Sequence, residues 1–304
     1  MVFPGQGSQS LGMQADLATE FPLVRQTYAE ASDILGYDLW TLVQEGPAER
    51  LSETVVTQPG MLTAGIAAYR VWQAAGGAAP AQVAGHSLGE YSALVAAQSL
   101  SFTDALRVVM RRSQLMSDAV PSGVGAMAAI IGLSDEQVMA VCDDASSVGV
   151  AEAVNFNSPG QVVIAGHKAA VDRAIELCEA AGARRAMLLP VSVPSHSSLM
   201  IDAGEALQDA LAAADFATPR IKVIAATDGK AYTGADNIRS RLSRQVYGPV
   251  HWATTVNAMI EGGTTNIIEC GPGKVLAGLC RRINKATPVN AIDSVGGLQK
   301  SLNA

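Results

Sequence analysis

The segment from Gly85 to Gly89 reads Gly-His-Ser-Leu-Gly and constrains the fold more than any other feature of this sequence. It follows a short apolar stretch, 82–84, and precedes residues 90–97, whose apolar spacing predicts a helix. Glycines at both ends of a G-x-S-x-G segment let a strand turn sharply into a helix and project the serine hydroxyl over the helix N-terminus. The segment therefore predicts a strand-turn-helix unit with Ser87 as a candidate nucleophile, the alternative being a serine that only shapes a tight turn. In the first case the backbone N–H of Leu88 is the natural oxyanion donor.

Strand and helix signals alternate along most of the chain. A short apolar strand opens the sequence at residues 1–4. Further predicted elements are helices 21–35, 58–75, 103–119, 198–213, 236–245, 252–261 and 275–283, and strands 222–226 and 266–270. This alternation predicts an α/β protein.

The middle of the chain has its own order of predicted strands and helices. We predict strands 126–131, 150–155, 161–165 and 186–193, with helices 134–143 and 169–181 between them. This β-α-β-β-α-β order is typical of a ferredoxin-like subdomain. Proline-containing segments at 121–123 and 194–195 mark the crossings, so we expect a body formed by residues 1–122 and 196–304 and an inserted subdomain of residues 123–195.

A serine nucleophile needs a base, most often a histidine, and the sequence offers four. His86 adjoins Ser87 and is expected to point away from it, and His167 precedes a helix of the small subdomain, so both are expected to be structural. Spacing leaves His196 and His251 as alternatives. No aspartate follows from spacing as a partner for the base, so a backbone carbonyl or an amide is considered for that role.

Two glycine-rich turns and two adjacent arginines are weaker signals. The turn 5–7 is expected to supply a second oxyanion donor or a phosphate-binding loop, but neither it nor 271–273 completes G-x-G-x-x-G. The sequence also has no P-loop and no H-E-x-x-H, so we expect no metal and no nucleotide cofactor. Arg111 and Arg112 point about 100° apart on a helix, so at most one can bind a substrate carboxylate. From the residues alone, an exposed arginine stripe is favoured over that role.

Charge and cysteine content restrict the partners. With 21 basic and 28 acidic residues the net charge is −7, which argues against binding nucleic acid or an anionic membrane. Its four cysteines are scattered without a C-x-x-C pair, and no signal peptide opens the chain, so we expect neither disulfides nor structural zinc. Apolar stretches end well before the ~20 residues that span a bilayer. We expect a cytoplasmic monomer.

Several of these motifs occur in the same order in one known family. They are Gly5–Gln9, Gly85–Glu90, the Arg112 helix, Asn155–Pro159, Val193–His196, Gln245 and Gly271–Gly273. In this the chain resembles the malonyl-CoA:acyl carrier protein transacylases over essentially its whole length, and most closely the stand-alone bacterial enzymes of type II fatty-acid synthesis. The resemblance implies an α/β-hydrolase-like body that carries a ferredoxin-like insert.

The resemblance also implies a reaction and a set of roles. A malonyl group would pass from CoA to the phosphopantetheine thiol of acyl carrier protein in ping-pong fashion, with no cofactor beyond the CoA thioester itself. The implied roles are Ser87 as nucleophile, His196 as base and acid, the backbone amides of Gln6 and Leu88 as oxyanion donors, Arg112 as the malonyl carboxylate ligand, and the Gln245 carbonyl as the group that orients His196. The resemblance thus reverses the preference for an exposed Arg112.

Alternatives to this function remain at the sequence level. A thioesterase or other serine hydrolase would use the same Ser87 and His196 with water as acceptor, malonyl loading for polyketide synthesis would use the same chemistry, and a binding module would keep only the fold. Carrier protein is acidic, so basic clusters are expected to receive it. The residues expected to dock it are Arg184, Arg185, Arg281 and Arg282.

Overall fold

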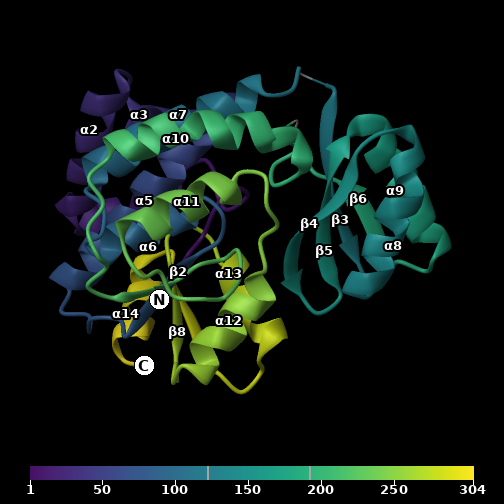
Figure 1. Ribbon diagram of the computed structural model, residues 1–304. Coiled ribbons are helices and arrows are strands. Elements are labelled where there is room, and N and C mark those ends of the chain that lie inside the picture. The colour runs from purple at the N-terminus through teal and green to yellow at the C-terminus, as the bar shows by residue number, and fades with distance from the viewer. Residues whose placement is uncertain (122, 192) are drawn as a thin grey trace.

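The computed structural model describes residues 1–121, 123–191 and 193–304. It contains a five-stranded sheet and a four-stranded sheet, and Figure 1 shows the smaller sheet with its helices set to one side of a larger body. Residue 122, at the first predicted domain boundary, and residue 192, within the predicted strand 186–193, lie outside the described residues. An α/β body with a small antiparallel subdomain is confirmed.

Parallel pairing of the larger sheet decides where the site forms. Its strands are β1 (Val2–Phe3), β2 (Gln82–Gly85), β7 (Lys222–Ile224), β8 (Ile267–Cys270) and β9 (Val289–Ile292). They lie in the order β7-β2-β1-β8-β9 with parallel pairing throughout. Phe3 pairs with Gly85 in the β1–β2 register. The turns that leave β1 and β2 therefore emerge side by side at the carboxyl edge of the sheet, where open α/β sheets bind ligands.

Helices cover both faces of this sheet. They are α1 (Ala15–Glu20), α2 (Pro22–Leu35), α3 (Leu39–Glu45), α4 (Ala48–Leu51), α5 (Thr54–Ala74), α6 (Gly89–Ala96), α7 (Phe102–Asp118), α10 (Ile201–Ala213), α11 (Ala235–Gln245), α12 (Trp252–Glu261), α13 (Val275–Ile283) and α14 (Val295–Leu302), with a short 3-10 helix η2 (Ser198–Met200) before α10. Side chains alternate across a strand. Phe3 thus joins the core built with α5, α6 and α7, whereas Val2 joins the core built with α12 and α13.

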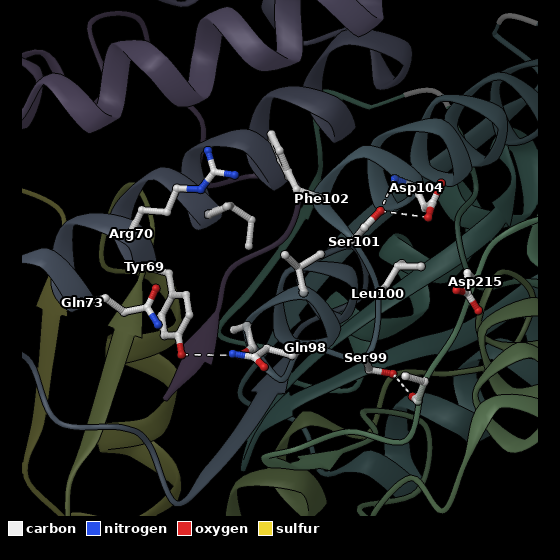
Figure 2. A pocket seen from close by; sticks show the side chains of 14 residues that line it. Tyr69, Arg70, Gln73, Gln98, Ser99, Leu100, Ser101, Phe102, Asp104 and Asp215 are labelled. Atoms are coloured by element: carbon white, nitrogen blue, oxygen red, sulfur yellow. Dashed lines mark hydrogen bonds between the residues drawn. The ribbon is translucent and has the colours of Figure 1, made fainter.

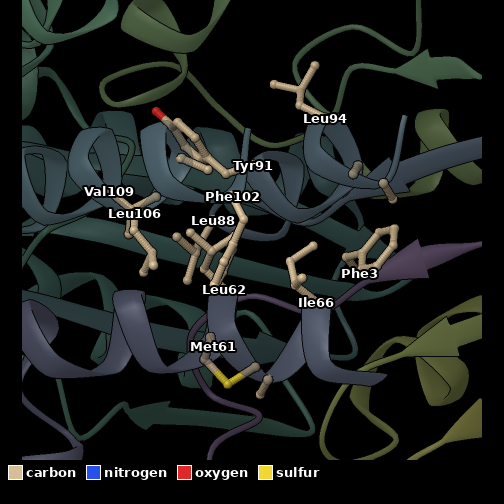
Figure 3. Close-up of a cluster of buried hydrophobic side chains, with 14 of the residues drawn as sticks. Phe3, Met61, Leu62, Ile66, Leu88, Tyr91, Leu94, Phe102, Leu106 and Val109 are labelled. Atoms are coloured by element: carbon tan, nitrogen blue, oxygen red, sulfur yellow. The ribbon is translucent and has the colours of Figure 1, made fainter. Parts of the chain in front are cut away.

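The first of these cores fixes α6, the helix that leaves the G-x-S-x-G turn. Figure 3 shows Leu88 among side chains of α5 and α7 such as Leu62 and Phe102, and Phe3 of the sheet beside Ile66 of α5. Leu88 exposes 1% of its surface, and Tyr91 and Leu94 expose none. Burying an aliphatic side chain contributes about 1.5–3 kcal/mol, so this packing holds the start of α6 firmly against the body.

The smaller sheet is antiparallel and has the predicted connectivity. Its elements are β3 (Gly125–Ile131), α8 (Asp135–Ala145), η1 (Ser146–Val148), β4 (Ala151–Ser158), β5 (Gln161–His167), α9 (Lys168–Ala180) and β6 (Arg185–Leu188). The strand order is β4-β5-β3-β6, and the two helices pack on one face. A capping box between Ser134 and Gln137 begins α8. The domain limits at 122/123 and 195/196 stay a prediction.

Some predicted bounds are wrong, and several short elements were not predicted. Helix α5 begins at Thr54 rather than 58, with Pro59 inside the helix. Strand β6 ends at Leu188 rather than 193. The missed helices and strand are α1, α3, α4, α14 and β9, and each has only four to eight residues.

Within the described residues, no helix combines the length and the apolar character needed to cross a membrane.

Candidate active site

The turn between β2 and α6 has the geometry of a nucleophile elbow. Ser87 has a φ of 50°, in the left-handed region that side chains rarely adopt. A Cβ on Gly85 would lie 1.9 Å from the carbonyl carbon of Gly89, and a Cβ on Gly89 would lie 2.1 Å from the carbonyl oxygen of Phe3. Only glycine fits at either position, which is the physical reason for the G-x-S-x-G pattern here.

The turn after β1 lies directly against this elbow. A Cβ on Gly5 would meet the carbonyl oxygen of His86 at 2.5 Å and the amide nitrogen of Leu88 at 3.7 Å. Within the described part of the chain, neither the backbone N–H of Gln6 nor that of Leu88 donates a hydrogen bond. Both residues line the cavity at Ser87. Two free backbone donors beside one serine hydroxyl are the arrangement that stabilises an oxyanion.

Ser87 and His196 are hydrogen-bonded. The Oγ of Ser87 lies 2.8 Å from Nε2 of His196, and Nδ1 of His196 lies 2.6 Å from the backbone oxygen of Gln245. A carbonyl oxygen can only accept, so Nδ1 carries the proton and Nε2 of the neutral ring accepts from the serine. The imidazole is thus oriented by a backbone carbonyl at the end of α11. The sequence had left a backbone carbonyl or an amide as the two possible partners.

Burial keeps this histidine neutral. His196 exposes 4% of its surface, and burial together with the positive charge of Arg112 lowers its pKa to about 3, against the opposing effect of the bond to Gln245. The ring is therefore an unprotonated base at neutral pH. The backbone of His196 has a φ of 68°, and its N–H donates to the carbonyl of Val246 at 3.0 Å.

Arg112 is the buried cation of the site. It exposes 1% of its surface, and its Nη2 donates to Ser87 Oγ at 3.2 Å, while Nη1 donates to the side-chain oxygen of Gln58 at 2.6 Å. Among the described residues, no carboxylate forms an ion pair with it, and its Nε has no partner. Arg111, the next residue toward the N-terminus, is exposed. The preference for an exposed stripe, drawn from the residues alone, was thus wrong for Arg112.

The other histidines lie elsewhere. His86 Nε2 lies 2.8 Å from the side-chain oxygen of Asn157, and Nδ1 of His167 accepts from the N–H of Val150 at 3.0 Å. His251 stacks on Phe156 with ring centroids 4.9 Å apart. It lines a different depression from the one that holds Ser87. The structure therefore separates the two alternatives that spacing left level, and brings His196 alone to Ser87.

The cavity at Ser87 is small and lies between the body and the small subdomain. Its volume is about 190 Å³, and its walls include Gln58 and Met116 from the body and Met127 and Leu189 from the subdomain. Pockets for drug-sized ligands usually measure roughly 300–1,000 Å³, so this one suits an acyl group of few atoms. Sequence reasoning missed Gln58, whose signal was a single side-chain amide among the apolar residues and threonines of segment 54–69.

The four arginines expected to dock a partner lie at two places. Arg184 and Arg185 are exposed at the start of β6. Arg281 and Arg282 are also exposed at the end of α13, where Arg281 donates to the carbonyl of Val289 at 2.6 Å and Arg282 to the side chain of Gln161 in β5. The second pair therefore lies where body and subdomain meet.

A further pocket, of about 510 Å³, lies beside the end of α6 (Figure 2). Its serines have structural partners: Ser99 donates to the carbonyl of Ala217 at 2.6 Å, and Ser101 caps α7. None of its lining residues is a histidine or a cysteine. Among the lining residues of this pocket, no serine is therefore paired with a histidine.

Comparison with known proteins shows the family of this chain. Residues 1–304 match the family described as acyl transferase domain, which places the chain among the acyltransferases. The chain is 53% identical over 301 residues to the malonyl CoA-acyl carrier protein transacylase of Escherichia coli strain K12, covering 99% of this chain and 97% of that one. The corresponding protein of Bacillus subtilis strain 168 is 42% identical, covering 96% and 92%.

Solved structures of similar proteins indicate the same family. A Vibrio cholerae acyl carrier protein S-malonyltransferase superposes with a TM-score of 0.95 at 54% identity, covering 98% of both chains. A malonyl-transacylase in complex with a type II PKS acyl-carrier protein superposes with a TM-score of 0.98 at 52% identity, covering 100% of this chain and 98% of that one. The chain belongs to the malonyl CoA-acyl carrier protein transacylases.

Proposed function

We propose that this chain transfers a malonyl group from CoA to acyl carrier protein through a malonyl ester on Ser87. Family membership supports the overall reaction, and the observation that carries the choice of acyl group is Arg112. Its guanidinium is buried next to the Ser87 hydroxyl without a carboxylate partner among the described residues. A buried unpaired cation is costly, and a free carboxylate two bonds beyond the thioester carbonyl would pair with it.

In the first half-reaction, His196 Nε2 takes the proton of Ser87 as Oγ attacks the malonyl thioester carbonyl. The oxyanion that forms accepts hydrogen bonds from the backbone N–H groups of Gln6 and Leu88. As the intermediate collapses, the C–S bond breaks and CoA leaves as the thiol with the proton from His196. The carbonyl oxygen of Gln245 supports the imidazolium meanwhile, because it accepts from Nδ1 in both protonation states.

The second half-reaction runs the same steps in reverse. The phosphopantetheine thiol of the carrier protein gives its proton to His196 and attacks the malonyl ester, and Ser87 leaves with that proton. Water would make the same attack in a thioesterase. The cavity of about 190 Å³ and a malonyl carboxylate held on Arg112 leave little room to activate water beside the ester.

The partner and setting form part of the same proposal. A relative of this chain forms a complex with a type II PKS acyl-carrier protein, which supports a carrier protein as acceptor, whether in fatty-acid or polyketide synthesis. Arg184, Arg185, Arg281 and Arg282 are exposed and would attract its acidic surface. All four cysteines are buried and unpaired, which supports a reducing compartment such as the cytoplasm. The proposal places the protein there as a monomer.

The test compares malonyl-CoA with acetyl-CoA as acyl donors, following acylation of Ser87 by intact-protein mass. For Arg112→Ala we expect kcat/KM for malonyl-CoA to fall at least about tenfold relative to acetyl-CoA, because an ion-paired hydrogen bond of about 1.5–3 kcal/mol is lost. The exposed neighbour supplies a matched control, and Arg111→Ala should keep the wild-type ratio. An unchanged ratio in Arg112→Ala would show that the carboxylate binds elsewhere.

A further inference from the structure

Glu90 is a buried carboxylate that the mechanism above does not use. It lies in the first turn of α6, three residues after the nucleophile, and exposes none of its surface. Three donors reach it: the hydroxyl of Tyr232 at 2.7 Å and the N–H of Ala226 at 3.3 Å bind Oε1, and the side-chain amide of Gln245 binds Oε2. An acid surrounded only by donors is matched by the carboxylate form, which can only accept.

The contact with Gln245 connects Glu90 to the site. Nε2 of Gln245 donates to Glu90 and also to the backbone oxygen of Ser87 at 3.0 Å, and Oε1 accepts from Nη2 of Arg112 at 3.1 Å. These contacts allow one orientation of the amide. Turned over, it would place its NH₂ against the Arg112 guanidinium, where two donors would meet, and its oxygen against Glu90, where two acceptors would meet.

We propose that Glu90 is a positioning residue for acyl selectivity: through the Gln245 amide it holds the Arg112 guanidinium where a malonyl carboxylate can bind. This rests on the proposed function of Arg112. The side-chain amide of Gln245 lies between the Glu90 carboxylate and the Arg112 guanidinium, with its dipole aligned to both charges. Glu90 therefore supports Arg112 without forming an ion pair that would compete with the substrate carboxylate. A protein carboxylate paired directly with Arg112 would have to be displaced by the malonyl carboxylate at each turnover.

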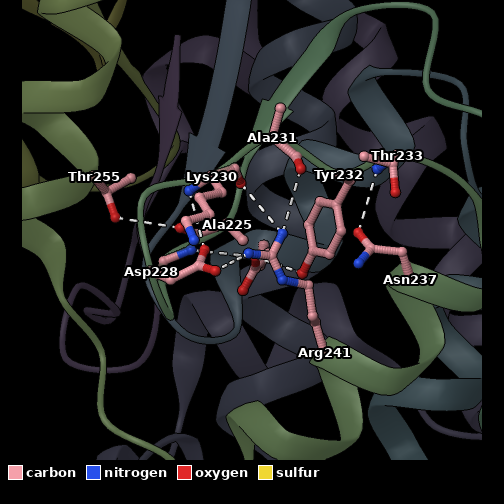
Figure 4. A network of polar contacts seen from close by, with 11 residues as sticks. Ala225, Asp228, Lys230, Ala231, Tyr232, Thr233, Asn237, Arg241 and Thr255 are labelled. Carbon is pink, nitrogen blue, oxygen red and sulfur yellow. Dashed lines mark hydrogen bonds and ion pairs between the residues drawn. The ribbon is translucent and has the colours of Figure 1, made fainter.

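The surroundings keep Glu90 in place. The ring of Tyr232 lies under the guanidinium of Arg241, with 5.2 Å between guanidinium carbon and ring centroid, and Arg241 is paired with Asp228 (Figure 4). Burial raises the pKa of Glu90 to about 7, against the three hydrogen bonds and the charge of Arg241, which lower it. At pH 8 the carboxylate form therefore predominates, and the assays belong at that pH.

A structural role alone is the competing explanation. Glu90 also ties α6 to the segment after β7 through Ala226 and Tyr232. If that were its whole purpose, its loss would lower the amount of active protein and reduce malonyl and acetyl transfer by the same factor. The ratio of the two kcat/KM values distinguishes the explanations, because it does not depend on the fraction of folded enzyme.

The first variant is Glu90→Gln, which is nearly isosteric but removes the charge and turns an NH₂ toward at least one of the three donors. We expect the malonyl-to-acetyl ratio to fall about tenfold, the size expected when a hydrogen bond to a charged group is lost. Tyr232→Phe is the control, since it removes a bond to Oε1 but leaves Gln245 untouched, and should keep the ratio within about twofold. An unchanged ratio in Glu90→Gln, or an equal fall in Tyr232→Phe, overturns the proposal.

A second variant keeps the test available if Glu90→Gln fails to fold. Gln245→Met retains the backbone carbonyl that orients His196 but removes the amide, so the ratio should fall as it does in Glu90→Gln, and Glu90→Gln should add nothing in its background. An unchanged ratio in Gln245→Met overturns the proposal. Wild type and Arg112→Ala are measured alongside: if they do not differ in the ratio, the proposed role of Arg112 fails first, independently of Glu90.

Discussion

The proposed acyl specificity depends on one side chain, that of Arg112. An arginine with 1% exposure and an unpartnered Nε would destabilise most folds. Here its Nη atoms bind Gln58, Gln245 and the nucleophile, all neutral groups. Neutral partners hold the side chain in place but do not cancel its charge, so the site remains complementary to an anionic acyl group.

His196 gives a prediction about pH and stability. Its pKa in the folded protein is lowered to about 3, mainly by burial, whereas the unfolded side chain titrates near its ordinary value of 6.5. Between these values the unfolded chain binds more protons, so the free energy of unfolding falls as pH falls through this range. We expect wild type to lose more stability between pH 7 and pH 5 than His196→Gln does, measured by urea unfolding.

The control for that measurement is Ser87→Ala, which keeps the imidazole buried and should follow the pH dependence of wild type. Equal pH dependence in wild type and His196→Gln would mean that the ring is protonated in the folded state near pH 6, and the general-base role would lose its electrostatic basis.

At the residue level, local patterns indicated Ser87 as a candidate nucleophile but left His196 and His251 as alternatives for the base, and only the family resemblance selected His196. The elbow is a local feature, so five consecutive residues predict it. His196 and Gln245 are 49 residues apart and meet only because the loop before η2 packs on the end of α11. The roles of Gln58 and Glu90 depend in the same way on tertiary contacts, which explains why no local pattern indicated them.

Among the elements, the turn between β2 and α6 depends most strictly on its sequence. A methyl group on Gly89 would lie 2.1 Å from the carbonyl oxygen of Phe3, so β1 or the elbow must move. We expect Gly89→Ala to lower the free energy of unfolding by about 3 kcal/mol or more and to abolish acylation. Urea unfolding monitored by circular dichroism measures the first effect.

Gly278 provides a control for the effect of Gly89→Ala on stability. In α13, a methyl group on Gly278 would meet nothing within 4 Å. Gly278→Ala should therefore stabilise the protein by about 0.5–1 kcal/mol, the helix-propensity difference between the two residues. A Gly89→Ala variant as stable as wild type would contradict the close packing of β1 against the elbow.

Elements with a clear period were predicted well from sequence, and short or irregular ones were not. The β-α-β-β-α-β order of the subdomain followed from alternating strands and from signals such as the Ser134 cap, and α12 and α13 have the predicted bounds. Strand β6 stops at Leu188 because the chain beyond it leaves the sheet to line the cavity, with Leu189 and Val191. Apolar residues occur both in a strand and in the wall of a cavity, so the sequence does not indicate where the strand ends.

On the scale of the whole molecule, the cavity at Ser87 lies where the body meets the small subdomain, and we call this line of contact the seam. One face of the small sheet packs on α8 and α9, and the opposite face contributes Met127 to the cavity at Ser87. The body supplies Ser87, His196 and Arg112. Arg282 of α13 contacts Gln161 of β5 along the same seam, and the proposed function would bring the carrier protein to it.

This placement gives a prediction about docking. Reversing two charges with Arg281→Glu and Arg282→Glu should raise the apparent KM for carrier protein several-fold and leave that for malonyl-CoA unchanged, because rim charges mainly affect the rate of association with an oppositely charged protein. Steady-state kinetics at low and moderate salt measures both constants. The double variant Arg107→Glu and Arg111→Glu on α7, at exposed residues that do not line the cavity, makes the same change in net charge and is the control. Equal effects on both substrates would argue against docking at α13.

The central claim is that Ser87 carries malonyl between two thiols. Intact-protein mass spectrometry after mixing with malonyl-CoA, and again after adding pantetheinylated carrier protein, tests it directly. We predict one added malonyl group that maps to Ser87, is absent in Ser87→Ala, and moves to the carrier thiol. A malonyl group that maps to another residue, or one that is lost to water before the carrier protein is added, would contradict the account.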